Sequence, residues 1–297
     1  MNKVVAEAIA ALIPRKMVRN RWRGILRYGP IKALRLKRRL RHDVSAHTHY
    51  LAVCAIAKDE GPYFKEWIEW HLSVGVEKFY IYDNESTDET RKVLQPYVDA
   101  GIVEYNYFPG YRMQLAAYDD CFERHRLDTR WIALIDLDEF IVPVKDKSIT
   151  EFLRLHENAP AVEINWLVYG SSGKHEKTDE PVMERFTRHS LYDHHLNRFV
   201  KSIVNPRRVY GMIGCHEAAR IDGRAEDTHG QPITRHFKER QPLHDVMRIN
   251  HYAVRSRQEF IEKQNRGRAS GRTHYVPDDY FDRFDLNDIQ DGVGRGV

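Results

Sequence analysis

The stretch Trp131–Glu139, WIALIDLDE, joins five apolar residues to three carboxylates. A short apolar run of this kind is typical of a strand that is buried in a parallel sheet. We therefore expect a strand over Trp131–Ile135, with Asp136 at its carboxyl end, where open α/β sheets bind their ligands. Asp136 and Asp138 are separated by one residue, so both carboxylates can reach one hard cation, directly or through water. The stretch predicts a Mg²⁺ or Mn²⁺ site at the edge of a sheet.

Two aspartates with this spacing also occur by chance, and the alternative is a solvated turn. The run Trp131–Ile135 favours the metal site, because it makes this turn part of a sheet edge. Strands and helices alternate along the chain at intervals of roughly 25 residues, as in βαβ units on a parallel sheet. The expected strands are 51–57, 78–82, 102–107, 131–135, 141–144 and 161–168. Helices are expected around 64–72 and ended by Gly75, from 86 to about 97, around 113–125, after 148 and from 256 to about 266. Three of them begin with residues that fit capping boxes: Ser86 with Glu89, Ser148 with Glu151 and Ser256 with Glu259.

Polar clusters follow three of these strands: Lys58-Asp59-Glu60, Asp83-Asn84-Glu85-Ser86 and Asp136-Leu137-Asp138-Glu139. The carboxyl ends of parallel strands share one edge of the sheet, so the clusters should converge there. Asp83 could accept hydrogen bonds from the base or ribose hydroxyls of a nucleotide. An Asx-turn or a helix cap explains the same residue equally well.

Two further residues are candidates with strong alternatives. His251 follows the strand-like run Val246–Ile249 and could give a nitrogen ligand to the same ion, although most of the sixteen histidines must be surface or core residues. Glu217 is a candidate general base, a carboxylate that would take the proton from a hydroxyl group of an acceptor substrate. The same role is open to Asp179, Glu180, Glu184 and Asp222, and for each of them a surface acid is the simpler interpretation.

Charge divides the chain into an arm and a body. Residues 1–43 contain thirteen of the 47 Lys and Arg but two of the 43 acidic residues, so the arm carries about +11 and the rest about −7. We expect a basic helical arm over 1–47, a main domain over 48–275 and an acidic to Gly-rich, disordered tail over 276–297. The arm, with six basic residues in Lys32–Arg41, is predicted to dock on an anionic membrane surface. Packing on the acidic body or unspecific binding to nucleic acid are the alternatives.

The sequence argues against several other classes of protein. No apolar run approaches the roughly 18 residues of a membrane-spanning helix, and the run Val4–Ile13, broken by Glu7, is not typical of a secretory signal. The cysteines Cys54, Cys121 and Cys215 suggest neither a disulfide framework nor a zinc site, so we expect a cytoplasmic protein, peripheral at the inner face of a membrane. Phosphate loops, dinucleotide-binding turns and nucleophile elbows are missing.

Several blocks together resemble glycosyltransferase family 92 and related family 2 enzymes. They are CAIAKDE at 54–60, EWIEWHLSVGV at 66–76, KFYIYDNESTD at 78–88, DLDEF at 136–140, NWLVYGSSG at 165–173, VKSIVNP at 200–206 and NHY at 250–252. The resemblance implies the GT-A fold, a Rossmann-like α/β sandwich that uses a nucleotide-sugar, here expected to be UDP-linked, and usually Mn²⁺.

The resemblance also implies roles for single residues. Asp136 and Asp138 match the D-x-D motif of such enzymes, His251 matches a further metal ligand, and Asp83 matches a nucleoside contact. The donor-binding set then comprises Lys58, Glu60, Asp83, Asn84, Gln114 and Asp136. Characterised members include inverting galactosyltransferases, so the expected reaction is hexosyl transfer to a glycan or lipid-linked acceptor. Another metal-dependent phosphate enzyme, such as a nucleotidyltransferase or phosphatase, and a non-catalytic nucleotide-sugar binder remain the alternatives.

Overall fold

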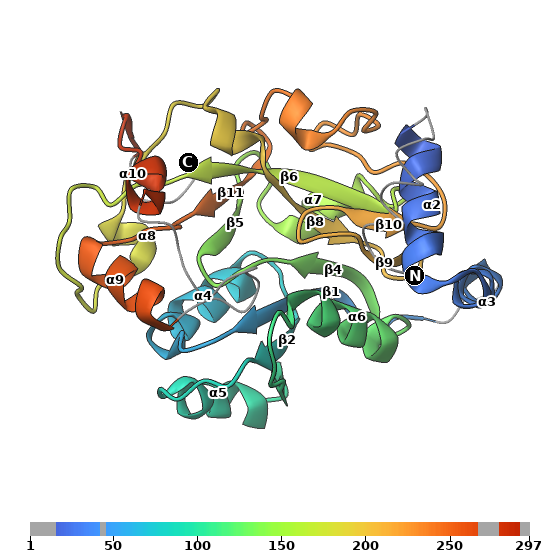
Figure 1. The fold of residues 1–297 in the computed structure, drawn as a ribbon, viewed down its shortest axis with the longest axis horizontal. Coiled ribbons are helices and arrows are strands. Elements are labelled where there is room, and N and C mark those ends of the chain that lie inside the picture. Colours follow the sequence, from blue (N-terminus) through green and yellow to red (C-terminus); the bar gives the residue numbers. More distant parts are fainter. Residues whose placement is uncertain (1–15, 42–45, 267–278, 292–297) are drawn as a thin grey trace.

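The computed structural model describes residues 16–41, 46–266 and 279–291 (Figure 1). Within them, eight strands form one sheet in the order β3-β2-β1-β4-β8-β6-β11-β5. Their bounds are β1 His49–Ala57, β2 Lys78–Asp83, β3 Val103–Tyr107, β4 Thr129–Leu134, β5 Glu139–Pro143, β6 Ala161–Val168, β8 Val200–Val204 and β11 Met247–His251. Only β8 and β5 run against the other six. This is the Rossmann-like α/β sandwich, with a mainly parallel sheet, that the sequence and its resemblance to GT-A enzymes predict.

Alternation along the central strands divides the core between the two faces of the sheet. On β1, Val53 and Ala55 pack in one apolar cluster with α4 (Gly61–Ser73), α5 (Thr90–Asp99) and α7 (Ile149–Arg154). The intervening Ala52 and Cys54 pack in a second cluster with α6 (Gln114–His125). Both faces are therefore covered, which is why the parallel strands appear as continuous apolar runs in the sequence.

Of the three capping boxes predicted from the sequence, two form at the start of a helix and one does not. The box at the start of α9 (Arg257–Arg266) is reciprocal, since Ser256 N–H donates to Glu259 and Glu259 N–H donates to the Ser256 hydroxyl. Ser148 likewise accepts from Glu151 N–H ahead of α7. The box predicted at Ser86 is wrong, because its hydroxyl accepts the Asp59 N–H from the neighbouring loop and α5 begins later, at Thr90.

Residues 175–250 hold short elements that the sequence pattern did not predict. They are α8 (Val182–Arg185), β7 (Arg188–His189), η1 (His195–Arg198), β8, the hairpin β9 (Val209–Met212) and β10 (Ala218–Arg220), and η2 (Phe237–Glu239). Strand β8 matters most, because it lies between β4 and β6 and pairs antiparallel with both. In the acidic tail, α10 (Tyr280–Phe284) and β12 (Ile289–Gln290) form, and β12 pairs with β7.

The basic arm forms helices α2 (Lys16–Tyr28) and α3 (Pro30–Arg41), which lie beside the β9–β10 hairpin (Figure 1). A third apolar cluster joins Ala33 of α3 to Tyr210, Ala219 and Ile221 of the body, with Tyr28 packed against it. The run Val4–Ile13 lies outside the described residues. Among the described helices, none is long and apolar enough to span a bilayer.

Candidate active site

Two of the three predicted polar clusters, those at 58–60 and 136–139, meet around a cavity of about 270 Å³ at the carboxyl ends of β1 and β4. Strand β8, the turn after β9 and helices α6, α9 and α10 complete its wall. The residues that line it are Ile56, Ala57, Lys58, Glu60, Gln114, Asp136, Leu137, Asp138, Trp166, Lys201, Cys215, His216, His251, Lys263, Arg266 and Tyr280. Asp136 therefore shares this cavity with five other residues that were predicted to bind the donor or the metal: Lys58, Glu60, Gln114, Asp138 and His251.

Asp136 is held in a fixed orientation by two neighbours. Gln114, the first residue of α6, donates its side-chain amide to Asp136 Oδ1 at 2.9 Å. Lys201 of β8 donates its ammonium to Asp136 Oδ2 at 2.7 Å. The Asp136 side chain remains about one third exposed, so it presents a charged, oriented edge to the cavity.

Asp138 and His251 form the part of the site that is best suited to a metal. The Asp138 carboxylate lies 3.8 Å from His251 Nε2 and accepts a 2.6 Å hydrogen bond from Lys263. Burial alone would raise the pKa of Asp138, but the charge of Lys263 lowers it well below its usual range. Burial lowers the pKa of His251 to about 4, so the imidazole is neutral at pH 7 and retains a lone pair for a ligand.

Glu139 also belongs to this cluster, although no role for it was predicted from the sequence. Single ligand atoms of Asp138, Glu139 and His251 lie within 4.8 Å of one another. Two of their buried polar atoms, Glu139 Oε1 and His251 Nδ1, have no hydrogen-bond partner among the described residues. Carboxylate oxygens suit Mg²⁺ and Mn²⁺, and an imidazole favours a transition metal over Mg²⁺. The donor set therefore fits Mn²⁺.

Lys201 compensates the acidic floor of the cavity. Its buried ammonium lies 3.2 Å from Glu139 and 2.7 Å from Asp136. Burial would lower the pKa of Lys201, but these two carboxylates raise it well above the ordinary value. Burial raises the pKa of Glu139 to about 8, even though Lys201 opposes the shift. The lysine thus keeps a positive charge beside Asp136 at neutral pH.

Glu60 pairs with two arginines, of which Arg266 lines the cavity and Arg255 is buried behind it. Its buried carboxylate pairs with Arg255 at 3.2 Å and with Arg266. Burial would raise the pKa of Glu60, but the two guanidinium groups lower it. Arg266 also borders a second cavity of about 220 Å³, which it shares with Lys58 and Asn84. Lys58 and Arg266 therefore connect the two cavities.

Asp83 and Asn84 lie at the end of β2, towards this second cavity. Asn84 lines it, and its amide donates to the carbonyl oxygens of Phe108 and Gly110. Asp83 accepts hydrogen bonds from Ser86 N–H at 2.9 Å and from the Tyr105 hydroxyl at 2.5 Å. The turn interaction that the sequence left open thus forms, and Asp83 is not among the residues that line either cavity.

Glu217 is not among the residues that line either cavity. The turn between β9 and β10 directs the preceding Cys215 and His216 to the first cavity instead. Glu217 closes the turn through its carbonyl oxygen, which accepts Ile213 N–H, and its charge acts on buried Arg220. The other candidates also lie elsewhere: Asp179, Glu180 and Glu184 line a separate groove, and Asp222 pairs with Arg208. The prediction of Glu217 as the base is not supported by its position.

A sequence profile of glycosyltransferase family 92 matches residues 49–282, most of the chain and all of the cavity. The chain belongs to glycosyltransferase family 92. A family 92 protein of Ricinus communis is 27% identical to it over 164 residues, 53% of this chain and 29% of that protein. A β-1,4-galactosyltransferase of Caenorhabditis elegans is 27% identical over 192 residues, 59% of this chain and 44% of that protein. The match thus spans less than half the length of either relative.

Among solved structures, Staphylococcus aureus TarS 1–349 in complex with UDP is 13% identical. It superposes with a TM-score of 0.37 over 53% of this chain and 47% of that chain.

Three cations of this family 92 member were missed by the sequence analysis: Lys201, Lys263 and Arg266. Lys201 had one signal, a lysine inside the apolar run Val200–Val204, where an unpaired charge would be costly. Lys263 and Arg266 stand in the last turn of α9, where basic residues are common for reasons that concern only the helix. Nothing local in the sequence connects them to Asp138 or Glu60.

Proposed function

We propose that this chain transfers a hexosyl group from a UDP-linked sugar to a glycan or lipid-linked acceptor, with inversion at the anomeric carbon. The observation that carries the proposal is the meeting of Asp136, Asp138 and His251 with Lys201 and Lys263 around one cavity. The β-1,4-galactosyltransferase relative supports a galactosyl donor. The alternatives, another metal-dependent phosphate enzyme or a binder without turnover, lack an observation of this kind.

The two connected cavities support an orientation for the donor. In this proposal the nucleoside lies beside Asn84 and Asp83, and the diphosphate passes Lys58 and Arg266, which border both cavities. Asp83 then acts mainly through the turn that it holds. The sugar lies towards Trp166 and His216, which line the first cavity but not the second.

We propose that the metal is held by Asp136, Asp138 and His251. The Glu139 carboxylate is a fourth candidate ligand. A bound Mn²⁺ would neutralise the charge that develops on the departing diphosphate. Lys201 and Lys263 add fixed positive charge at the same place, and such preorganised charge is the largest source of rate enhancement in many enzymes.

A donor screen tests the proposal. Purified chain is incubated with UDP-galactose, UDP-glucose and other nucleotide-sugars, with Mn²⁺ or with EDTA, and the release of free nucleoside diphosphate is measured. We expect release from a UDP-sugar that requires Mn²⁺. Release that persists in EDTA would contradict the metal requirement but not the transfer reaction. The two lysines could then stabilise the leaving diphosphate in place of the ion. Binding without release from any donor would support the non-catalytic alternative.

The variant Asp138→Asn separates the site from the fold. We expect turnover to fall on the order of 10²- to 10³-fold, as for the loss of one electrostatic stabiliser. The fold should survive, although the melting temperature should fall because the buried ion pair with Lys263 is lost. Asp193→Asn, which changes an exposed aspartate outside both cavities, is the matched control. Near-normal turnover of Asp138→Asn in saturating Mn²⁺ would contradict the assignment.

A further inference from the structure

Helix α3 presents an unusual face to solvent. Ile31 and Leu34 are 72% and 68% exposed, and Arg35 and Arg38 are exposed beside them. Spacings of three, four and seven residues place all four on one side of the helix. The opposite side is fixed to the body, because Ala33 is buried in the cluster with Tyr210. The exposed face therefore combines two large aliphatic side chains with two guanidinium groups.

Within residues 16–41, 46–266 and 279–291, no side chain pairs with the charges of this face. Arg35 and Arg38 make no ion pair or hydrogen bond with any residue in the described part of the chain. By contrast, Arg27 pairs with Asp119 at 2.9 Å, and Lys32 pairs with Glu123 of α6. These two ion pairs hold the arm on the body, while the two arginines stay available to a partner.

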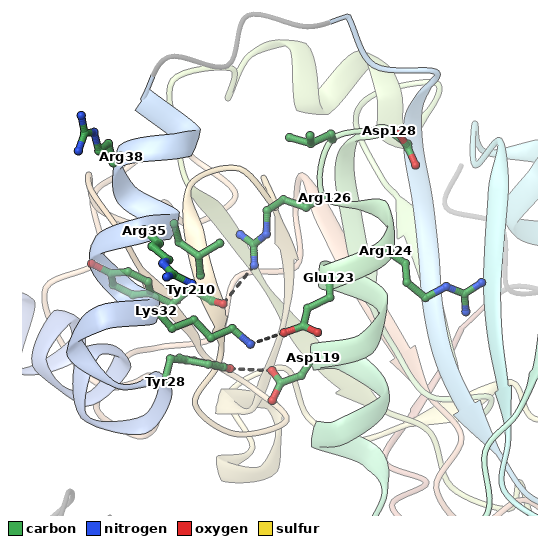
Figure 2. Close-up of a pocket in the computed structure, with 12 residues that line it drawn as sticks. Tyr28, Lys32, Arg35, Arg38, Asp119, Glu123, Arg124, Arg126, Asp128 and Tyr210 are labelled. Atoms are coloured by element: carbon green, nitrogen blue, oxygen red, sulfur yellow. Dashed lines mark hydrogen bonds and ion pairs between the residues drawn. The ribbon is translucent and has the colours of Figure 1, made fainter.

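Arg35 and Arg38 also border a cavity of about 800 Å³ between α3 and α6 (Figure 2). Most other charges in it are engaged: Lys32 with Glu123, and Arg126 with the carbonyl oxygens of Pro206 and Val209. The cavity is thus a poor site for a free anion but has room for a headgroup. A lipid phosphate at its edge would meet both free guanidinium groups while the acyl region meets Ile31 and Leu34.

We propose that the outer face of α3 docks this enzyme on an anionic lipid bilayer. Aliphatic side chains gain from insertion at the boundary between headgroups and acyl chains, and cations gain from the negative surface potential. A nucleic acid would satisfy the arginines but leave Ile31 and Leu34 in water. The charge balance also favours an orientation of the protein on the bilayer. The arm carries about +11 and the body about −7, so an anionic surface attracts the arm and repels the body. The proposal does not depend on the transfer reaction.

Vesicle flotation of the full-length chain tests it. The vesicles are phosphatidylcholine alone or with about one third phosphatidylglycerol, at low salt. We expect the wild type to float only with the anionic vesicles. The doubles Ile31→Ser/Leu34→Ser and Arg35→Gln/Arg38→Gln should each lower the partition coefficient on the order of tenfold. Leu155→Ser, which removes an equally exposed leucine (76%) from the end of α7, should leave it unchanged.

Melting temperature and donor turnover show that each variant is folded. Three results would overturn the proposal: a wild type that floats with neither vesicle, equal flotation with both, or doubles that float like the wild type. A fourth would assign the face to a second copy of the chain, namely a wild-type dimer by light scattering that Ile31→Ser/Leu34→Ser makes monomeric.

Discussion

At the residue scale, the floor of the candidate site depends on one buried lysine. Lys201 is enclosed by protein and faces both Asp136 and Glu139. Taking an ion pair out of water costs energy that its mutual attraction offsets only when all partners are present. Replacing Lys201 leaves the Asp136 carboxylate and the buried Glu139 carboxyl group without their cation, so Lys201 should matter for stability as well as for donor binding.

We therefore expect Lys201→Met to destabilise the fold by about 3–5 kcal/mol, as for a broken buried pair. Denaturant unfolding measures the change, with exposed Lys145→Met as the control. Adding Glu139→Gln to Lys201→Met should recover part of the loss, because it removes the buried carboxyl group that has lost its cation. Strictly additive losses in the double variant would show that Glu139 and Lys201 do not depend on each other.

Without the family resemblance, the residues of the site could be predicted only where they follow a strand. Asp136 and Asp138 were found because an apolar run precedes them. Lys201 was missed although it touches Asp136, since that contact depends on β8 lying next to β4. Periodicity gives the type of an element but not the order of strands in a sheet. The short strand β8, with one charge in five residues, also lacks the length that made the other strands evident.

At the scale of elements, α9 carries two cations of the site and is fixed by its first turn. Glu259 closes the capping box with Ser256 and also forms a buried ion pair with Arg185 of α8 at 2.9 Å. The box could be predicted from sequence because it is local. The pair with Arg185 could not, because 74 residues separate the partners. The helix therefore positions Lys263 and Arg266 through a contact that only the fold supplies.

This contact predicts a pH dependence of stability. Burial would raise the pKa of Glu259, but hydrogen bonds from Arg185 and Ser256 lower it from 4.5 to about 2. Because the folded pKa is depressed, the contribution is complete above pH 4.5 and is lost as the pH falls from 4.5 towards 2. It amounts to about 3 kcal/mol at neutral pH.

Glu259→Gln should lower the free energy of unfolding at pH 7 by about that amount and flatten its decline between pH 4.5 and 2. Urea unfolding across this range measures both effects. Glu262→Gln on the same helix is the control, because Glu262 is exposed and pairs only at the surface with Lys177. An unchanged pH profile in Glu259→Gln would mean that another carboxylate controls acid unfolding.

At the scale of the whole molecule, the arm and the cavity share one structural element. The β9–β10 hairpin packs against the arm through Tyr210 and Ala219, and its turn places Cys215 and His216 in the cavity wall. Tyr28 of the arm donates to Met212 O and to Asp119 of α6. The charge split along the sequence predicted an arm, but not that it would support a wall of the site.

Gly24 tests this connection, because it sits where α2 touches the hairpin. A Cβ at this position would lie 2.7 Å from the Tyr210 ring and 2.9 Å from Ala219 Cβ. In an isolated helix, Gly→Ala stabilises by about 1 kcal/mol. Gly24→Ala should instead lower the melting temperature, expose the arm to trypsin and reduce donor turnover through the displaced turn. Leu34→Ser, on the free face of α3, should change none of the three. If Gly24→Ala makes the arm susceptible to trypsin while turnover stays normal, the hairpin holds the cavity wall in place without the arm.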